Sequence, residues 1–232
     1  MDHWIMNHSN NAVIADIDRQ IDSRRLLLHP FYQRWTAGQL TLAALQDYAR
    51  QYYHHVAAFP AYLSAVHSNT NDLPARRQIL ENLMDEEAGD PNHPELWLQF
   101  AEGLGVKRED VQQAEQWPET RNLIGSFRAV CRDGSTAEGL AALYAYESQI
   151  PAVAESKIAG LKAFYEVVSE RALAYFDVHI KADEEHSKIE RRLLEGYVDE
   201  SNAAAVKGSV AKVLDALWEM LSGVDRRYPM AA

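Results

Sequence analysis

Three side chains in one stretch of the sequence have types and spacing that suit metal binding. His179, Asp183 and His186 stand at positions i, i+4 and i+7. At about 100° per residue, an α-helix places all three within about 60° on one face. Two imidazoles and a carboxylate without thiolate favour iron or manganese. Because polar residues are also common on exposed helix faces, the spacing is typical of a solvated helix as well.

A second polar cluster lies in the first half of the chain. Asp85, Glu86 and Glu87 are consecutive, and His93 follows the helix-breaking stretch Gly-Asp-Pro-Asn. One of the three acids and His93 could point into the same cavity. A run of charges is usually a solvated face, and the residues alone do not decide which acid would turn inward.

Glu147 is the third candidate, because it follows the apolar and aromatic run at residues 141–146. An unpaired carboxylate is expensive to bury, and a metal ion offsets that cost. The three clusters together supply three carboxylates and three histidines from separate helices, as in di-metal sites of helical bundles. Asp183 and His186 have the spacing of the Glu-x-x-His motif of ferritin-like proteins, with Asp in place of Glu. No second such motif occurs, so the ferritin fold is a poor match.

Composition limits the classes of function. The chain has 232 residues, with 34 acidic and 23 basic side chains and a net charge of −11, which argues against a nucleic-acid partner. Its single cysteine, Cys131, excludes an internal disulfide and a thiolate-clustered metal site. No apolar run approaches the roughly 20 residues that span a bilayer. The N-terminal residues lack the pattern of a signal peptide, so we expect a cytoplasmic protein with no membrane partner.

The elements that must position these residues are predicted to be helices only. Apolar periodicity indicates a single all-α domain over residues 1–232 with about seven to nine helices, and with flexible termini at 1–12 and 224–232. Thr41, Ser135 with Glu138, and Ser169 are predicted N-caps. The predicted helical segments are 14–28, 31–35, 41–68, 74–88, 94–104, 118–130, 135–147 with a restart at Pro151, one from 169 through 186, and 203–221.

Longer blocks of the sequence resemble a known family. They include His-Pro-Phe-Tyr-Gln-Arg-Trp at 29–35, Asp-Tyr-Ala-Arg-Gln-Tyr-Tyr at 47–53, Asn-Leu-Met-Asp-Glu-Glu at 82–87 and Ala-Ala-Leu-Tyr-Ala-Tyr-Glu-Ser-Gln-Ile-Pro at 141–151. In their order and their residues, these blocks resemble the sequences of the family of the chlamydial protein associating with death domains. Members of this family are haem-oxygenase-like di-metal oxidases related to TenA and PqqC. The resemblance, from about residue 20 to 197, implies a haem-oxygenase-like bundle that is usually a homodimer.

The resemblance also implies a ligand set and two reacting residues. Matched position by position, the metal ligands are Glu86, His93, Glu147, His179, Asp183 and His186. The implied cofactor is a pair of metal ions, Fe/Fe or mixed Mn/Fe, used with dioxygen and an external reductant. Family members are implicated in making p-aminobenzoate for folate biosynthesis from a tyrosine of the protein itself, with a lysine as the proposed amino donor. Those positions are Tyr32 and Lys157.

Without the resemblance, several residues have simpler interpretations. Tyr32 would be assigned to packing and Lys157 to the surface. Tyr48 belongs to an aromatic helical stripe that suits a core or a cavity wall. A buried structural thiol fits Cys131 better than a TenA-like nucleophile.

Two other functions are compatible with the chain. One is a TenA- or PqqC-like enzyme of cofactor biosynthesis that acts on an external small molecule. The other is a non-enzymatic protein that associates with death domains. Making p-aminobenzoate from tyrosine needs oxidising equivalents that acid–base side chains cannot supply, and the complete ligand set favours the oxidase.

Overall fold

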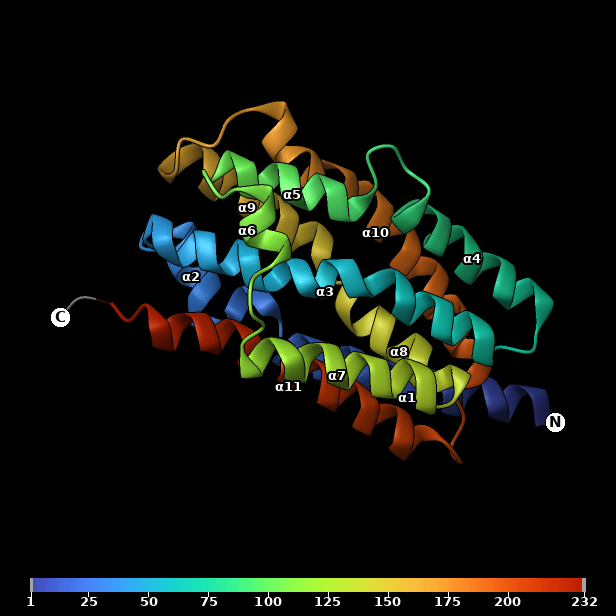
Figure 1. The fold of residues 1–232 in the computed structure, drawn as a ribbon. Coiled ribbons are helices and arrows are strands. Elements are labelled where there is room, and N and C mark those ends of the chain that lie inside the picture. Colours follow the sequence, from blue (N-terminus) through green and yellow to red (C-terminus); the bar gives the residue numbers. More distant parts are fainter. Residues whose placement is uncertain (1, 231–232) are drawn as a thin grey trace.

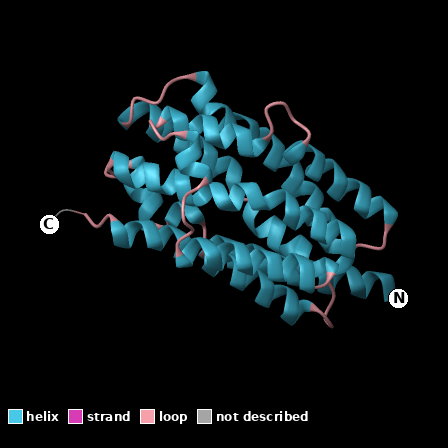
Figure 2. Cartoon of the chain, in the orientation of Figure 1, coloured by secondary structure: helices cyan, strands magenta, loops and turns pink. Residues whose placement is uncertain are grey.

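The computed structural model describes residues 2–230, with side chains from residue 12 onward, and this part of the chain is helical without strands (Figure 2). This confirms the all-α prediction. None of its helices is long and apolar enough to cross a bilayer. The elements are α1 (Asp2–Ser23), η1 (Leu26–Leu28, a 3₁₀ turn), α2 (Pro30–Thr36), α3 (Leu42–Asn69), α4 (Leu73–Glu87), α5 (His93–Gly103), α6 (Arg108–Gln112), α7 (Pro118–Asp133), α8 (Thr136–Glu147), α9 (Ile150–Phe164), α10 (Glu170–Tyr197) and α11 (Ala203–Arg227).

The eleven α-helices of the described residues exceed the predicted seven to nine. Helix α6 was missed because it has five residues and buries only Val111, so no apolar period marks it. Local signals located other boundaries correctly. The Thr41 and Ser169 side chains accept hydrogen bonds from the backbone N–H groups of their helices, and Ser135 forms a capping box with Glu138.

Helix α3 runs through the middle of the molecule (Figure 1). It packs on α5 and α4 along one side and on α7 along the other, while α10 contacts α5, α8 and α9. Side chains at this centre are large and aromatic, and Trp35, Tyr48 and Trp97 are fully buried. Helices α2, α3, α4, α5, α8, α9 and α10 surround this interior, and they carry the six candidate metal ligands together with Tyr32 and Lys157.

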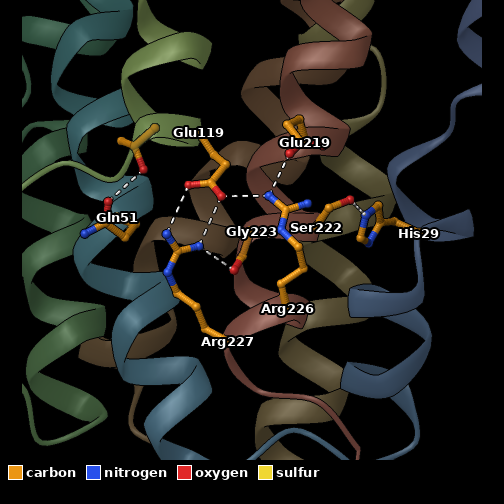
Figure 3. Close-up of polar contacts among 9 residues, drawn as sticks. His29, Gln51, Glu119, Glu219, Ser222, Gly223, Arg226 and Arg227 are labelled. Atoms are coloured by element: carbon orange, nitrogen blue, oxygen red, sulfur yellow. Dashed lines mark hydrogen bonds and ion pairs between the residues drawn. The ribbon is translucent and has the colours of Figure 1, made fainter.

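The C-terminal segment 224–232, which the sequence predicts to be flexible, packs against the bundle as far as Tyr228. Helix α11 continues to Arg227, Val224 is buried, and the Tyr228 hydroxyl donates a hydrogen bond to Asp47. Arg226 and Arg227 both donate hydrogen bonds to Glu119 of α7 (Figure 3). These ion pairs hold the last turn of α11 against the bundle. Residues 231–232 lie outside the described part.

The backbone of α1 is helical from Asp2, within the segment 1–12 that the sequence predicts to be flexible. The helix ends at Ser23 rather than continuing to residue 28, and η1 follows. Ile14 and Ile17 of this helix are buried. Helix α1 therefore contributes to the same apolar core as the rest of the bundle, and residue 1 lies outside the described residues.

Glu119 should make the attachment of α11 sensitive to pH. Burial raises its pKa, but hydrogen bonds from Arg227, from its own backbone N–H and from Arg226 outweigh this and lower it from 4.5 to about 2. A carboxyl group with a lowered pKa stabilises the fold above its unfolded pKa, and this contribution is lost as pH falls toward 2. We expect Glu119→Gln to lower the free energy of unfolding by about 1–2 kcal/mol at pH 7, and by much less near pH 2.

Urea unfolding at both pH values measures this difference. Glu219→Gln is the matched control, because Glu219 pairs with the same Arg226 but its side chain is 49% exposed. That substitution should cost less than half as much. An equal cost for the two variants at pH 7 would contradict the role assigned to Glu119.

Candidate metal centre

Four helices bring the six predicted ligands together in two buried groups. Helices α4 and α5 supply Glu86 and His93, α8 supplies Glu147, and α10 supplies the other three. In each group the potential ligand atoms lie within 4.8 Å of one another. The groups are Glu86, His93 and His179, and Glu147, Asp183 and His186. Each could hold one metal ion.

In the first group the nitrogen and oxygen atoms converge on shared space. His93 Nδ1 and Glu86 Oε2 are 2.9 Å apart, yet His93 Nδ1 has no hydrogen-bond partner among the described residues. His179 Nδ1 lies 2.6 Å from the carbonyl oxygen of Tyr175, which makes Nδ1 the donor and leaves Nε2 as the ligand atom. Burial, together with the neighbouring His93, holds the pKa of His179 well below its usual value. This imidazole is therefore neutral, the form that binds metals.

In the second group the ligands are oriented by residues outside it. Asn82 Nδ2 donates to both carboxylate oxygens of Glu147, at 3.1 and 3.2 Å. His186 Nε2 lies 3.0 Å from Asp85 Oδ2, while His186 Nδ1 is 3.7 Å from Glu147 and 3.8 Å from Asp183. A carboxylate on the far nitrogen fixes the tautomer of a metal-binding histidine. The residue Asp85 supplies this contact from the exposed side of α4.

The donor atoms fit a pair of metal ions. Within the described residues, Asp183 Oδ2 and His186 Nδ1 are buried without hydrogen-bond partners. Burial raises the pKa of Asp183 well above its usual range, with the negative charges of Glu147 and Glu86 adding to the effect. Buried carboxylates this close repel one another unless protons or cations lie between them. Three carboxylates and three imidazoles suit two ions that prefer oxygen and nitrogen ligands.

Lys157 is enclosed by aromatic rings, so the residue-based interpretation of a surface lysine is wrong. Its side chain is 3% exposed, because α9 packs this face against α2 and α10. The Nζ atom lies 5.1–5.6 Å from five ring centroids, those of Tyr32, Tyr48, Tyr52, Trp97 and Phe176. Burial lowers the pKa of Lys157 to about 7. A substantial fraction of the amine is therefore neutral near pH 7.

Tyr48 links the two residues that the resemblance implies are reactive. Lys157 Nζ donates a hydrogen bond to the Tyr48 hydroxyl at 2.7 Å, and the Tyr48 and Tyr32 hydroxyls are 3.4 Å apart. Burial raises the pKa of the Tyr32 phenol, which therefore stays protonated. The sequence indicated only that Tyr48 lies on an aromatic stripe, because its contacts come from α2 and α9.

Glu190 was also missed by sequence reasoning. It lies on α10 one turn after His186 and is 4% exposed, and neither of its carboxylate oxygens has a hydrogen-bond partner in the described chain. Burial and the adjacent charge of Glu147 raise its pKa well above the usual range. The spacing of four residues from His186 continues the polar stripe and could have revealed it. Cys131, in contrast, is buried as predicted, and burial raises the pKa of its thiol to about 12.

Two small cavities lie beside the metal-binding groups and Lys157, and they share three lining residues. Glu86, His179 and Asp183 line one cavity, and Lys157 and His179 line the other; Tyr146 and Tyr175 line both. Each has a volume of about 10 Å³, which is room for about one water molecule. Neither cavity can hold an aromatic ring from outside the protein.

Sequence comparison identifies relatives over nearly the whole chain. The model of the TENA/THI-4/PQQC family matches residues 17–224. A protein of Chlamydia pneumoniae described as 4-aminobenzoate synthase is 48% identical over 206 residues, which cover 89% of this chain and 92% of the relative. A protein of Nitrosomonas europaea with the same description is 42% identical over 230 residues, or 95% of this chain and 94% of the relative.

Structure comparison confirms the predicted fold. A domain of unknown function with a haem-oxygenase-like fold, from Shewanella denitrificans, superposes with a TM-score of 0.74. The match covers 92% of this chain and 90% of the other, at 20% sequence identity. At this identity the likeness shows that the two chains share the haem-oxygenase-like bundle.

Proposed function

Since the chain belongs to the TENA/THI-4/PQQC family, we propose that it is a 4-aminobenzoate synthase that makes its product from its own tyrosine side chain. Relatives 48% and 42% identical carry this description. The self-sacrificing route goes beyond their names. It is supported by the arrangement of rings around Lys157.

The observation that carries this proposal is the small size of the cavity that Lys157 lines, which has no room for an external aromatic ring. The cavities between this amine and the metal-binding groups each hold about one water molecule. The position that an aromatic substrate would need is filled by tyrosines of the protein. Tyr32 and Tyr48 are the two that are linked to Lys157 through hydroxyl groups.

The proposed metal pair is Fe/Fe or mixed Mn/Fe. Glu86, His93 and His179 would hold one ion, and Glu147, Asp183 and His186 the other. With dioxygen and an external reductant, the pair would supply the oxidising equivalents needed to cleave the tyrosine side chain and oxidise its benzylic carbon to a carboxylate. Asn82 and Asp85 would keep Glu147 and His186 in position.

The protein's own residues prepare the ring and the amine. Lys157, with its pKa lowered to about 7, presents a nitrogen lone pair that an exposed lysine would not offer at neutral pH. Its hydrogen bond to Tyr48 holds Nζ 5.6 Å from the centre of the Tyr32 ring. Trp97 and Phe176 cover the amine and shield it from bulk solvent. The arrangement keeps the amine beside the Tyr32 ring and away from bulk solvent.

Product formation without any added aromatic compound tests the proposal. Purified protein loaded with Fe(II), or with Mn(II) and Fe(II), should release 4-aminobenzoate when it receives a reductant and oxygen. Mass spectrometry of the small-molecule fraction detects the product, and metal-free or anaerobic samples should form none. Product that appears only after an aromatic compound is added would instead favour an enzyme acting on an external small molecule.

Metal binding should stabilise the protein, and Asp183→Asn should remove this gain. At a free metal concentration 100 times the dissociation constant, an ion that binds only the folded state adds about 2.7 kcal/mol to the free energy of unfolding. We expect the variant to gain less than half of the wild-type amount, while its metal-free form is at least as stable as the wild type because a buried carboxylate is gone.

Thermal unfolding with and without Mn(II) measures both quantities. Asp177→Asn, an exposed position on the same helix, is the matched control and should behave like the wild type. An unchanged metal-dependent gain in Asp183→Asn would remove Asp183 from the proposed ligand set.

A further inference from the structure

A pocket of about 320 Å³ between α4 and α10 reaches the second metal-binding group from the surface. We call it the α4–α10 pocket; Leu63 and Leu143 complete its wall. His186 lines this pocket and also belongs to the group with Glu147 and Asp183. The pocket is therefore continuous with the proposed metal centre, whereas Lys157 is not among the residues that line it.

Charge in the pocket favours a cation. Glu81, Asp85, Glu185 and Glu190 line it, together with one ammonium group, that of Lys181. The carboxylates lie at different depths. Glu81, Asp85 and Glu185 are exposed, whereas Glu190 is 4% exposed. A positive ion would thus meet negative charge at the surface and carboxylate oxygens again inside.

Glu190 is the most deeply buried of the carboxylates that line this pocket, and it has no role in the proposed ligand set. Both of its carboxylate oxygens lack hydrogen-bond partners in the region that the structure describes. A buried carboxylate in this state is costly unless a cation or a proton reaches it. It lies one helical turn from His186, and its carboxyl group interacts with that of Glu147.

Asp85 connects the mouth of the pocket to the interior. Its side chain is 62% exposed, yet its Oδ2 atom lies 3.0 Å from Nε2 of the buried His186. An ion arriving from solvent would find carboxylate oxygens first at Asp85 and then at Glu190. Oxygen ligands exchange readily around Mn(II) and Fe(II), which suits a route as well as a final site.

We propose that divalent metal ions reach the Glu147–Asp183–His186 group through the α4–α10 pocket, and that Glu190 binds the ion on its way in. This inference rests on the proposed metal-dependent function. It adds a transient cation site at Glu190, which is not one of the six proposed metal ligands. Glu190 affects the rate of metal uptake and is not a ligand of the two metal ions that remain bound.

The rate of Mn(II) uptake by metal-free protein tests the role of Glu190. Electron paramagnetic resonance of the free ion follows uptake with time, and elemental analysis gives the final metal content. We expect Glu190→Gln to slow uptake at least tenfold while the final content stays at that of the wild type. Glu184→Gln is the matched control, because Glu184 is exposed on the same helix and does not line the pocket.

Blocking the pocket gives a second measurement that leaves Glu190 intact. Cys131 is the chain's only cysteine and is 1% exposed, so a maleimide should react only with an introduced thiol. A bulky maleimide on Glu81→Cys should slow Mn(II) uptake. The same label on Glu184→Cys should not.

The outcomes separate the possible explanations. Wild-type uptake rates in both Glu190→Gln and the labelled Glu81→Cys protein would overturn the route while leaving the proposed function intact. A lower final metal content in Glu190→Gln would make Glu190 a permanent ligand and would also overturn it. If the wild-type protein takes up no metal, the proposed function and this inference are both wrong.

Discussion

Protein grown on ring-labelled tyrosine should release labelled 4-aminobenzoate, and the amount should not exceed about one molecule per chain. The limit follows because the ring that becomes product is part of the protein and is not replaced. Metal, a reductant and oxygen are added to the purified protein, and product is quantified by mass spectrometry. Many turnovers, or unlabelled product, would show that an external substrate is used.

Peptide analysis identifies the tyrosine that is consumed. Tyr32 and Tyr48 both lie near the amine, with ring centroids 5.6 and 5.1 Å from Lys157 Nζ. Cleavage by trypsin after arginine places them on separate peptides, residues 26–34 and 35–50. We expect the mass loss in the first peptide, because the family resemblance assigns the reacting ring to Tyr32.

Tyr32→Phe should form almost no 4-aminobenzoate and should retain its metal. Phenylalanine keeps the buried ring and its packing against Phe31 and Trp35 but lacks the phenol that is oxidised. Tyr48→Phe is the informative comparison. It removes the hydroxyl between Lys157 and Tyr32, so we expect slower product formation with the mass loss still at Tyr32. Normal product from Tyr32→Phe would transfer the role to Tyr48 or another ring.

Lys157→Met should abolish the product and leave the metal content unchanged. Methionine has a similar length and suits an aromatic enclosure, but it has no nitrogen to transfer. In wild-type protein grown on nitrogen-15-labelled lysine, the label should appear in the product. Lys162→Met, at an exposed position of the same helix, is the control and should keep wild-type activity. Unlabelled product from the labelled protein would show that another nitrogen donor is used.

The Lys157→Met variant also tests whether the amine of Lys157 is charged in the folded protein. Burial lowers the pKa of Lys157 from 10.5 to about 7, so the unfolded chain binds more protons than the folded protein between these two pH values. Wild-type stability should therefore rise with pH across this window relative to Lys157→Met. Urea unfolding at pH 7 and pH 9.5 measures the difference. A constant difference between the two proteins would mean that the amine is charged in the folded state.

Local sequence rules predicted helices where all the required signals lie within a few residues. The capping box of Ser135 and Glu138 and the N-cap of Thr41 depend on contacts three residues apart, and both are present. Helix α6 has no such signal and was missed. The end of α11 was misplaced because its stability comes from Glu119, which lies more than 100 residues away in the chain.

The helical bundle and the shared face of His179, Asp183 and His186 could be predicted from the amino-acid sequence alone, because helical periodicity depends only on residues of the same helix. The sequence could not separate Glu86 from Asp85 by residue type, nor Lys157 from Lys162. The tertiary structure decided these cases, since one member of each pair is enclosed and the other is exposed. Burial depends on which helix packs against a given face, and the groups that enclose Glu86 and Lys157 come from distant helices. Enclosure lowers the pKa of Lys157, so that part of its amine is neutral. It also makes a cation favourable beside Glu86 and the other buried carboxylates. The proposed chemistry of these residues depends on both effects.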